Sequence, residues 1–178
     1  MATSDLSSIE RAKRLKLIIF DVDGVLTDGG LRYGAQGELI KTFNVLDGHG
    51  IKMLQHSGVR TAIISARDSS IVARRAADLG ISILRQGVHD KKLAYEETIA
   101  ELKLRYEECA FMGDDVIDLP VMTRVGFAIS VPNGHPEVRR RAHYVSEARG
   151  GNGAVREVCD FILQAQGNYE SALAPYLS

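Results

Sequence analysis

Short apolar segments alternate with amphipathic segments along most of the chain. Brief, mostly apolar runs without regular polar alternation are typical of strands that are buried on both faces of a sheet. Such runs predict strands at Lys16–Phe20, Arg60–Ser65, Ile81–Leu84, Cys109–Gly113 and Gly126–Ser130. We therefore expect a sheet that is covered on both sides.

The segments between these strands have the apolar spacing of amphipathic helices. Ser69–Leu79 places its apolar residues on one face, and Gly80 follows as a helix stop. Similar spacing predicts helices from Ile51 to the residue before Gly58 and over Asp90–Tyr106, Glu137–Ala142 and Ala154–Leu163. Strands that alternate with helices indicate a three-layer, Rossmann-like α/β fold with a parallel sheet and right-handed crossovers.

One stretch breaks this alternation directly after the first strand. The strand-like runs Leu31–Tyr33 and Leu39–Phe43 flank the glycine-containing turn Gly34–Glu38. This pattern predicts a β-hairpin at about residues 30–43. Because ligands of parallel sheets bind outside the carboxyl ends of the strands, the hairpin should lie beside the ligand crevice. We expect it to serve as a lid or a subunit contact.

Composition and charge limit the classes of partner. The chain has 178 residues, 45% of them hydrophobic, and a formal net charge of −1, which suits one domain spanning residues 1–178. It offers no broad basic field for nucleic acid or anionic lipid. No apolar run is long enough to cross a membrane, and the polar segment Met1–Glu10 lacks the apolar region of a signal peptide. Cys109 and Cys159 define neither a disulfide framework nor a metal site, so we expect two thiols in a reducing cytoplasm.

Aspartates follow two of the predicted strands. Asp21 and Asp23 come after the first strand, and Asp114 and Asp115 follow the strand that ends at Gly113. The carboxyl ends of parallel strands share one edge, so these carboxylates should converge. Two carboxylates about 4 Å apart repel by roughly 4 kcal/mol at an effective dielectric constant of about 20. The cluster therefore needs a cation, and an all-oxygen ligand set favours magnesium over zinc.

Each aspartate pair also has a purely structural interpretation. Asp23 with Gly24 is a common tight-turn pair, and Asp114 or Asp115 could cap the helix that follows. Neither interpretation explains why four carboxylates would gather at one edge.

Two further residues complete a candidate phosphate site. Ser65 ends an apolar strand, where its hydroxyl and nearby backbone N–H groups could bind phosphate oxygens. Lys91 begins the long predicted helix, a position at which cations are usually disfavoured by the helix dipole. A lysine there is better explained if it faces a phosphate and the carboxylates.

The order Asp-x-Asp, Ser, Lys and Gly-Asp-Asp between Lys16 and about Val131 resembles the haloacid dehalogenase-like phosphatase superfamily. The resemblance implies Asp21 as nucleophile and Asp23 as general acid and then general base. It implies that Ser65 and Lys91 hold the phosphoryl group. It also implies Mg²⁺ as cofactor, bound by Asp21, the backbone carbonyl of Asp23, and Asp114.

Within that superfamily the chain is especially similar to the family of 3-deoxy-D-manno-octulosonate 8-phosphate phosphatases. The similarity rests on FDVDGVLTDG (20–29), KTFNVLDGHG (41–50), ISAR (64–67), GDDVIDLP (113–120) and GGNGAVREVC (150–159). It implies a capless enzyme that forms the free sugar acid for lipopolysaccharide synthesis through an aspartyl-phosphate intermediate. It further implies a homotetramer assembled by the hairpins, in which neighbouring subunits close each active site. A C-terminal tail at about residues 164–178 can reach toward an active site in this family.

The same resemblance implies a set of substrate contacts. They are Asp23, Asn44, Val45, Leu46, Asp47, Gly48, Lys52, Arg67, Arg75 and Lys91. Arg67 follows the Ser65 position closely, so it is well placed to grip a substrate carboxylate through two parallel hydrogen bonds.

Three other functions are compatible with parts of this pattern. A nonulosonate 9-phosphate phosphatase could use the same scaffold. A phospho-receiver module also combines acidic residues with a lysine, but here the acidic pair comes after Lys91 and the candidate acceptor lies on the first strand. A non-catalytic oligomerisation module is the third alternative, and the complete set of catalytic residues argues against it.

Overall fold

The computed structural model describes residues 6–177; residues 1–5 of the expected polar N-terminus and residue 178 of the expected tail lie outside this range. Its main sheet is parallel throughout, with the strand order β5-β4-β1-β6-β7-β8. The strands are β1 (Leu17–Phe20), β4 (Arg60–Ile64), β5 (Ile83–Arg85), β6 (Cys109–Met112), β7 (Phe127–Ser130) and β8 (Tyr144–Val145). This arrangement confirms the predicted α/β fold with a parallel sheet.

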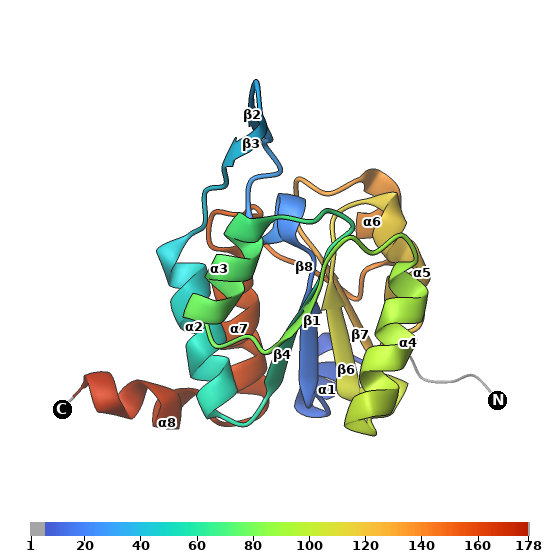
Figure 1. Ribbon diagram of the computed structural model, residues 1–178. Coiled ribbons are helices and arrows are strands. Elements are labelled where there is room, and N and C mark those ends of the chain that lie inside the picture. Colours follow the sequence, from blue (N-terminus) through green and yellow to red (C-terminus); the bar gives the residue numbers. More distant parts are fainter. Residues whose placement is uncertain (1–5, 178) are drawn as a thin grey trace.

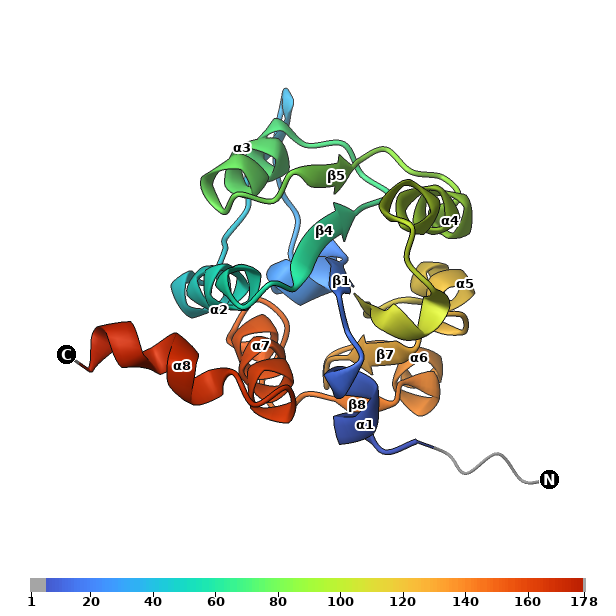
Figure 2. The ribbon, with the colours of Figure 1, turned by 90° about the horizontal axis from the view of Figure 1, so that it is seen from below.

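Helices cover both faces of the sheet, as Figures 1 and 2 show. One face carries α1 (Ser8–Lys13), α2 (Val45–His56), α3 (Ser70–Asp78) and α7 (Ala154–Ala165), and the other carries α4 (Lys91–Leu102), α5 (Leu119–Met122) and α6 (Pro136–Arg141). Among residues 6–177, no helix has the length and apolar character needed to span a bilayer.

Strand β1 shows why its sequence lacks polar alternation. Successive side chains of a strand point to opposite faces, so Ile18 and Phe20 join the core on one side while Leu17 and Ile19 join the core on the other. All four are fully buried. Each contributes roughly 1.5–3 kcal/mol through burial of its apolar surface. The central strand is thereby fixed, and with it the position of Asp21 at its end.

The predicted hairpin is present above the carboxyl edge of the sheet (Figure 1). Its antiparallel strands are β2 (Arg32–Gly34) and β3 (Gly37–Ile40). Large apolar side chains on it are exposed, namely Leu31, Tyr33, Leu39 and Ile40. No large cap domain accompanies it in the described part of the chain.

Helix α2 begins at Val45, whereas the sequence pattern predicted a start at Ile51. The side chain of Asn44 accepts hydrogen bonds from the backbone N–H groups of Leu46 (2.8 Å) and Asp47 (3.3 Å). This cap starts the helix before its apolar periodicity begins, and for that reason the apolar pattern alone missed the first turn.

Among the other boundaries that differ from the prediction, two have a clear cause in the backbone. Helix α4 ends at Leu102 rather than Tyr106, because Lys103 adopts a left-handed conformation with φ of 55°. Strand β5 starts at Ile83 rather than Ile81, because the Ile81 N–H still bonds to the carbonyl of Ala76 and closes helix α3.

The C-terminal tail forms α8 (Tyr169–Leu173) and a 3-10 turn (Ala174–Tyr176). It extends away from the sheet at the end opposite the hairpin (Figure 1). The Tyr176 ring lies edge-on to the His49 ring of α2, with centroids 5.3 Å apart. In its own chain the tail therefore contacts α2 and not the carboxyl edge of the sheet.

Candidate active site

Asp21 follows β1 directly and is held by the sheet. Its backbone N–H donates to the carbonyl of Met112 at the end of β6 (3.0 Å), and the residue as a whole is 5% exposed. The turn Val22–Leu26 then leads out of the sheet through Gly24, whose φ is 96°. A Cβ on Gly24 would lie 2.0 Å from Oδ2 of Asp114. Only glycine permits both this turn and the approach of the second acidic loop.

Lys91 lies between two carboxylates. Its Nζ is 2.9 Å from Oδ1 of Asp21 and 2.6 Å from Oδ1 of Asp118, and the lysine is buried. The other oxygen of Asp118 accepts the backbone N–H groups of Asp114 (3.0 Å) and Asp115 (3.2 Å). Asp118 thus fixes both Lys91 and the loop after β6, a role that its sequence position did not reveal.

The two acidic segments meet as the sequence predicted for Asp21 and Asp114. Carboxylate oxygens of Asp21, Asp114 and Asp118 lie within 4.8 Å of one another. Asp118 already uses both oxygens as hydrogen-bond acceptors, whereas Oδ1 of Asp114 is buried without a hydrogen-bond partner. An oxygen-only donor set with an unpaired buried oxygen suits a hard divalent cation such as Mg²⁺.

The protonation equilibria reflect this concentration of negative charge. Burial and the Asp118 carboxylate raise the pKa of Asp21 to about 6, although the Lys91 ammonium opposes them. Burial and the carboxylates of Asp21, Asp118 and Asp115 raise the pKa of Asp114 to about 7. Burial lowers the pKa of Lys91, but its pairing with Asp21 and Asp118 outweighs this effect and raises it overall. A bound cation would favour the ionised form of both raised carboxyl groups.

Ser65 and Arg67 lie on the neighbouring strand end. Ser65 is buried at the end of β4, and its Oγ accepts the backbone N–H of Arg67 at 3.4 Å. Both residues line a cavity of about 240 Å³ at the carboxyl edge, together with Asp21, Asp23, Asp114 and Asp115. Asp115 is exposed and accepts the N–H of Val116 (2.7 Å), so it is the member of its pair that caps the following turn.

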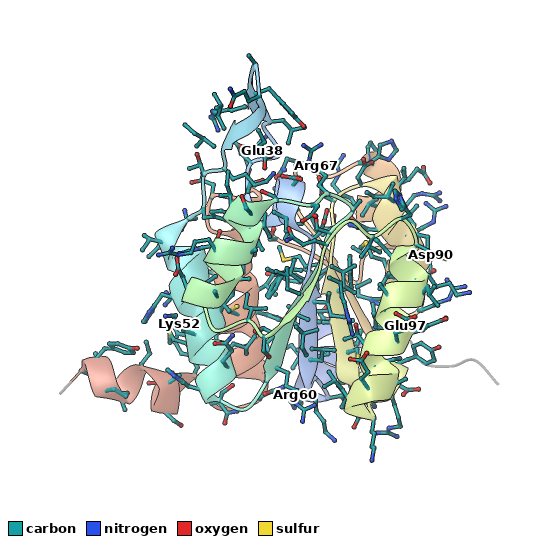
Figure 3. The ribbon with its side chains drawn as sticks, in the orientation of Figure 1. Glu38, Lys52, Arg60, Arg67, Asp90 and Glu97 are labelled. Carbon is teal, nitrogen blue, oxygen red and sulfur yellow. The ribbon has the colours of Figure 1, made fainter. Side chains whose placement is uncertain are left out.

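Asp23 lines the same cavity and contacts two cations, one after the hairpin and one after β4. Its Oδ1 pairs with Nζ of Lys41, and its Oδ2 is 3.6 Å from Nε of Arg67. Lys41 also pairs with Glu38 of β3, with Nζ 2.8 Å from Oε1. Figure 3 shows Glu38 at the base of the hairpin and Arg67 beside it. Sequence reasoning missed Lys41 and Glu38. The only sign of Lys41 was a charge within the otherwise largely apolar run Leu39–Phe43.

Several predicted substrate contacts lie outside this cavity in the same chain. Val45 and Leu46 are exposed on the first turn of α2, and Lys52 lies farther along its outer side (Figure 3). The guanidinium of Arg75 stacks over the Phe43 ring at 5.6 Å and donates to the carbonyl of Asn44 at 3.3 Å. Their side chains form a surface around the start of α2 that is separate from the cavity and includes both polar and apolar groups.

Asp47 and Gly48 are buried by packing between helices. Oδ1 of Asp47 accepts the backbone N–H of Arg156 (2.8 Å) at the start of α7. The carboxylate of a residue in α2 thus caps the N-terminus of α7. Burial raises the pKa of Asp47 although the backbone N–H groups of α7 oppose the shift. Gly48 lies against the Arg75 side chain, with no room for a Cβ.

The loop before α7 packs against the turn Val22–Leu26, which is called the catalytic turn below. Asn133 donates through Nδ2 to the carbonyl of Gly24 (3.4 Å) and accepts the N–H of Gly150 through Oδ1 (2.9 Å). Gly151 donates its N–H to Val25 (2.8 Å). A Cβ on Gly150 would lie 1.7 Å from the Gly24 carbonyl oxygen. The glycine pair therefore permits direct backbone packing against the turn that carries Asp23.

The sheet is parallel, and an aspartate follows its central strand. A serine and an acidic loop follow the two flanking strands, and a lysine pairs with that aspartate. This arrangement is the one found in hydrolases of the haloacid dehalogenase type. A sequence model described as haloacid dehalogenase-like hydrolase matches residues 74–158.

Comparison with individual proteins narrows this class. The chain is 49% identical to the 3-deoxy-D-manno-octulosonate 8-phosphate phosphatase of Yersinia pestis over 92% of its own length and 88% of that protein. It is also similar to the crystal structure of a probable YrbI family phosphatase from Pseudomonas syringae, with 54% identity, a TM-score of 0.94 and coverage of 96% and 97% of the two chains.

A third similar protein has a crystal structure with ligands bound. It is the 3-deoxy-D-manno-octulosonate 8-phosphate phosphatase of Moraxella catarrhalis in complex with a magnesium ion, a phosphate ion and a KDO molecule. The identity is 44%, the TM-score is 0.92, and the match covers 95% of this chain and 97% of the other. The chain belongs to the 3-deoxy-D-manno-octulosonate 8-phosphate phosphatase family within the haloacid dehalogenase-like hydrolases.

Proposed function

We propose that this protein hydrolyses 3-deoxy-D-manno-octulosonate 8-phosphate to the free sugar acid and phosphate through an aspartyl-phosphate on Asp21. The main structural support is Lys91, which contacts the buried Asp21 beside the cavity that Ser65 and Asp114 also line. The family relationship supports the substrate.

In the first half-reaction, the Asp21 carboxylate attacks phosphorus and the bond to the sugar oxygen breaks. Lys91 and Ser65 hold phosphoryl oxygens, and the lysine ammonium offsets the charge that develops on them. Asp23 enters this step protonated on Oδ2, while Oδ1 accepts the Lys41 ammonium, and it gives this proton to the departing sugar oxygen. Asp23 lines the same cavity as Asp21, two residues away along the turn.

In the second half-reaction, water attacks the phosphorus of the aspartyl-phosphate. Asp23, now ionised, takes a proton from this water, and the bond from phosphorus to the Asp21 oxygen breaks. Splitting one displacement into two allows a single carboxylate to serve as acid and then as base.

We propose that Asp21, the backbone carbonyl of Asp23, and Asp114 hold the magnesium ion of this family. The unpaired buried oxygen of Asp114 and the raised pKa values of Asp21 and Asp114 support this ligand set. The bound ion supplies charge neutralisation at the phosphoryl oxygens and the carboxylates.

Arg67 is the proposed partner of the substrate carboxylate. It lines the cavity mouth, 39% of its side chain is exposed, and its distances of 3.6 Å to Asp23 and 3.9 Å to Glu38 leave both pairings loose. An incoming carboxylate could therefore recruit this guanidinium without breaking a tight ion pair.

We further propose a homotetramer formed through the hairpin. The exposed apolar side chains of Leu31, Tyr33, Leu39 and Ile40 support such an interface. The surface around the start of α2, with Asn44–Gly48, Lys52 and Arg75, would then contribute substrate contacts to a neighbouring subunit's cavity. This assignment accounts for their distance from the cavity of their own chain.

The reaction would take place in the cytoplasm and serve lipopolysaccharide precursor synthesis. Cys109 and Cys159 are buried and free, as expected in a reducing compartment.

Phosphate release with magnesium tests the proposal, using 3-deoxy-D-manno-octulosonate 8-phosphate, a nonulosonate 9-phosphate and common sugar phosphates. We expect a strong preference for the octulosonate, which chelation and Asp21→Asn both abolish. Asp78→Asn is the matched control, because it makes the same change at an exposed carboxyl group of α3. Equal activity on the nonulosonate would overturn the substrate assignment, and no release from any ester would overturn the reaction.

A further inference from the structure

Lys41 is a buried lysine between the hairpin and the catalytic turn. It follows β3, only 1% of its side chain is exposed, and its Nζ pairs with Asp23 and with Glu38. Burying an ammonium is unfavourable unless its partners compensate. Here the carboxylates of Asp23 and Glu38 do so.

The contacts of Lys41 separate it from the substrate-binding cations. Two carboxylates occupy its ammonium, and it is not part of the cavity lining. Arg67, in contrast, lines the cavity and holds the same two carboxylates only at 3.6 and 3.9 Å. Beside Asp23 and Glu38, Lys41 is therefore a tightly paired cation, whereas Arg67 is only loosely paired with these carboxylates and donates Nη2 to the Tyr33 hydroxyl.

Glu38 connects Lys41 and Asp23 to the start of helix α3. Its Oε1 binds Lys41 and its Oε2 accepts the hydroxyl of Ser69 (2.8 Å), which precedes helix α3. Ser69 is also fixed through its backbone N–H, which donates to Oε1 of Gln86 (3.1 Å). The chain of contacts runs from α3 through Glu38 and Lys41 to Oδ1 of Asp23.

We propose that Lys41, anchored by Glu38, is a positioning residue that holds the Asp23 carboxylate in place for proton transfer to the leaving group. This inference rests on the proposed function and adds to it a role for the hairpin within a single chain. Asp23 lies on a turn and not on a strand, so its side-chain orientation depends on such a contact. Proton transfer requires the donor within about 2.6–3.2 Å of the accepting oxygen.

The test compares two phosphate esters under excess enzyme, so that slow turnover is still resolved. A sugar alkoxide leaves only when it is protonated, whereas 4-nitrophenolate leaves without a proton. For Lys41→Met we expect kcat/KM on the sugar acid phosphate to fall by about 10- to 100-fold, a part of the 10²- to 10⁴-fold that general acid catalysis supplies. On 4-nitrophenyl phosphate it should fall by less than about 3-fold, and the inhibition constant of inorganic phosphate should not change.

Three variants accompany this comparison. Asp23→Asn should show the same selective loss to a greater extent, and Lys41→Arg should recover part of the activity because it keeps the charge. Lys13→Met removes an exposed lysine of α1, far from the hairpin, and should match the wild type on both esters. Glu38→Gln, on the exposed hairpin, should reproduce the selective loss in a weaker form and provides a second test if Lys41→Met does not fold.

Equal losses on both esters in Lys41→Met or Glu38→Gln would overturn the inference, since a general disturbance of the fold gives that result. Unchanged activity on both would overturn it as well. Failure of the wild type on the sugar acid phosphate would contradict the proposed function alone. The comparison of an alkyl with an aryl ester can then use any alkyl phosphate that the wild type accepts.

Discussion

Asp118 acts on the site without facing the cavity. One of its oxygens binds Lys91 and the other binds two backbone N–H groups of the loop that contains Asp114. A single buried carboxylate thus sets the distance between the cation that contacts Asp21 and the second acidic segment. Such shared partners make the effects of substitutions at these positions non-additive.

At the residue scale, Asp114 should determine the response to magnesium. Ligand binding to the folded state adds about 2.7 kcal/mol at a free concentration of one hundred times Kd, or roughly 5–10 °C in Tm for a chain of this size. We expect this rise for the wild type in a thermal melt with magnesium against chelator. Asp114→Asn should melt higher than the wild type in chelator, because it removes a repelling charge, and should respond little to magnesium.

Asp115→Asn is the matched control, because it keeps an acceptor for the N–H of Val116 and leaves Asp114 in place. It should retain most of the rise. An undiminished magnesium response in Asp114→Asn would contradict the proposed ligand set.

At the element scale, the glycine loop before α7 should control the geometry of the catalytic turn. Gly150→Ala brings a methyl group onto the Gly24 carbonyl, where its Cβ would be 1.7 Å from the oxygen. Overpacking of this kind costs about 1–3 kcal/mol, and a displacement of about 1 Å can lower activity by about 10²-fold. We expect both effects in chemical denaturation and in kcat/KM.

Gly58→Ala serves as the control for the methyl group itself. Gly58 has a φ of 97°, but the space around its added Cβ is open. It lies between α2 and β4, at the opposite edge of the sheet. This substitution should cost about 1–2 kcal/mol in backbone strain and leave kcat/KM unchanged. Equal activity losses in both variants would show that the contact with Gly24 has no special effect.

The 3-10 turn before β6 should contribute a pH-dependent part of the stability. Glu108 pairs with Lys16 (2.8 Å) and accepts the N–H of Arg105 (2.9 Å), and these contacts lower its pKa to about 2. A depressed pKa in the folded state means that the stabilisation is present above the unfolded pKa and is lost as the pH falls. Glu108→Gln should therefore lower Tm above about pH 4.5, and its difference from the wild type should shrink toward pH 2.

Glu107→Gln changes the exposed neighbour and should keep the pH dependence of the wild type. A Glu108→Gln protein whose Tm parallels the wild type across this pH range would contradict the assigned contact.

The strand-end residues were predictable because parallel strands place their carboxyl ends together. This rule located Asp21, Ser65 and Asp114 from local apolar runs alone. Lys41 was not predictable in this way, because its contact with Asp23 depends on how the hairpin folds back over the turn. Asp47 shows the opposite case: it stands within a motif of the family, but in its own chain its carboxylate caps α7. Side-chain capping likewise placed the start of α2 where apolar spacing gave no indication.

At the scale of the whole molecule, the hairpin should determine the oligomeric state. Specific interfaces bury about 800 Å² on each partner, and the exposed apolar residues of the hairpin offer a nucleus for one. Leu39 is 61% exposed on β3. Leu39→Glu should convert the proposed tetramer to smaller species in light scattering after size exclusion. Activity should fall with it if neighbouring subunits complete each site.

Ile9→Glu is the matched control, since Ile9 is 51% exposed on α1. It should keep the mass of the wild type. A Leu39→Glu protein with unchanged mass would exclude β3 from the interface.

The contact of Gly150 and Gly151 with the turn after β1 also has a consequence for biosynthesis. A ribosome makes Asp21, Asp23, Ser65, Lys91 and Asp114 well before it reaches this glycine pair. An incomplete nascent chain carries every one of these side chains, yet it lacks the backbone that packs against the turn at Gly24 and Val25. Interrupted synthesis therefore yields a fragment with the full set of catalytic residues but without the support that orders them.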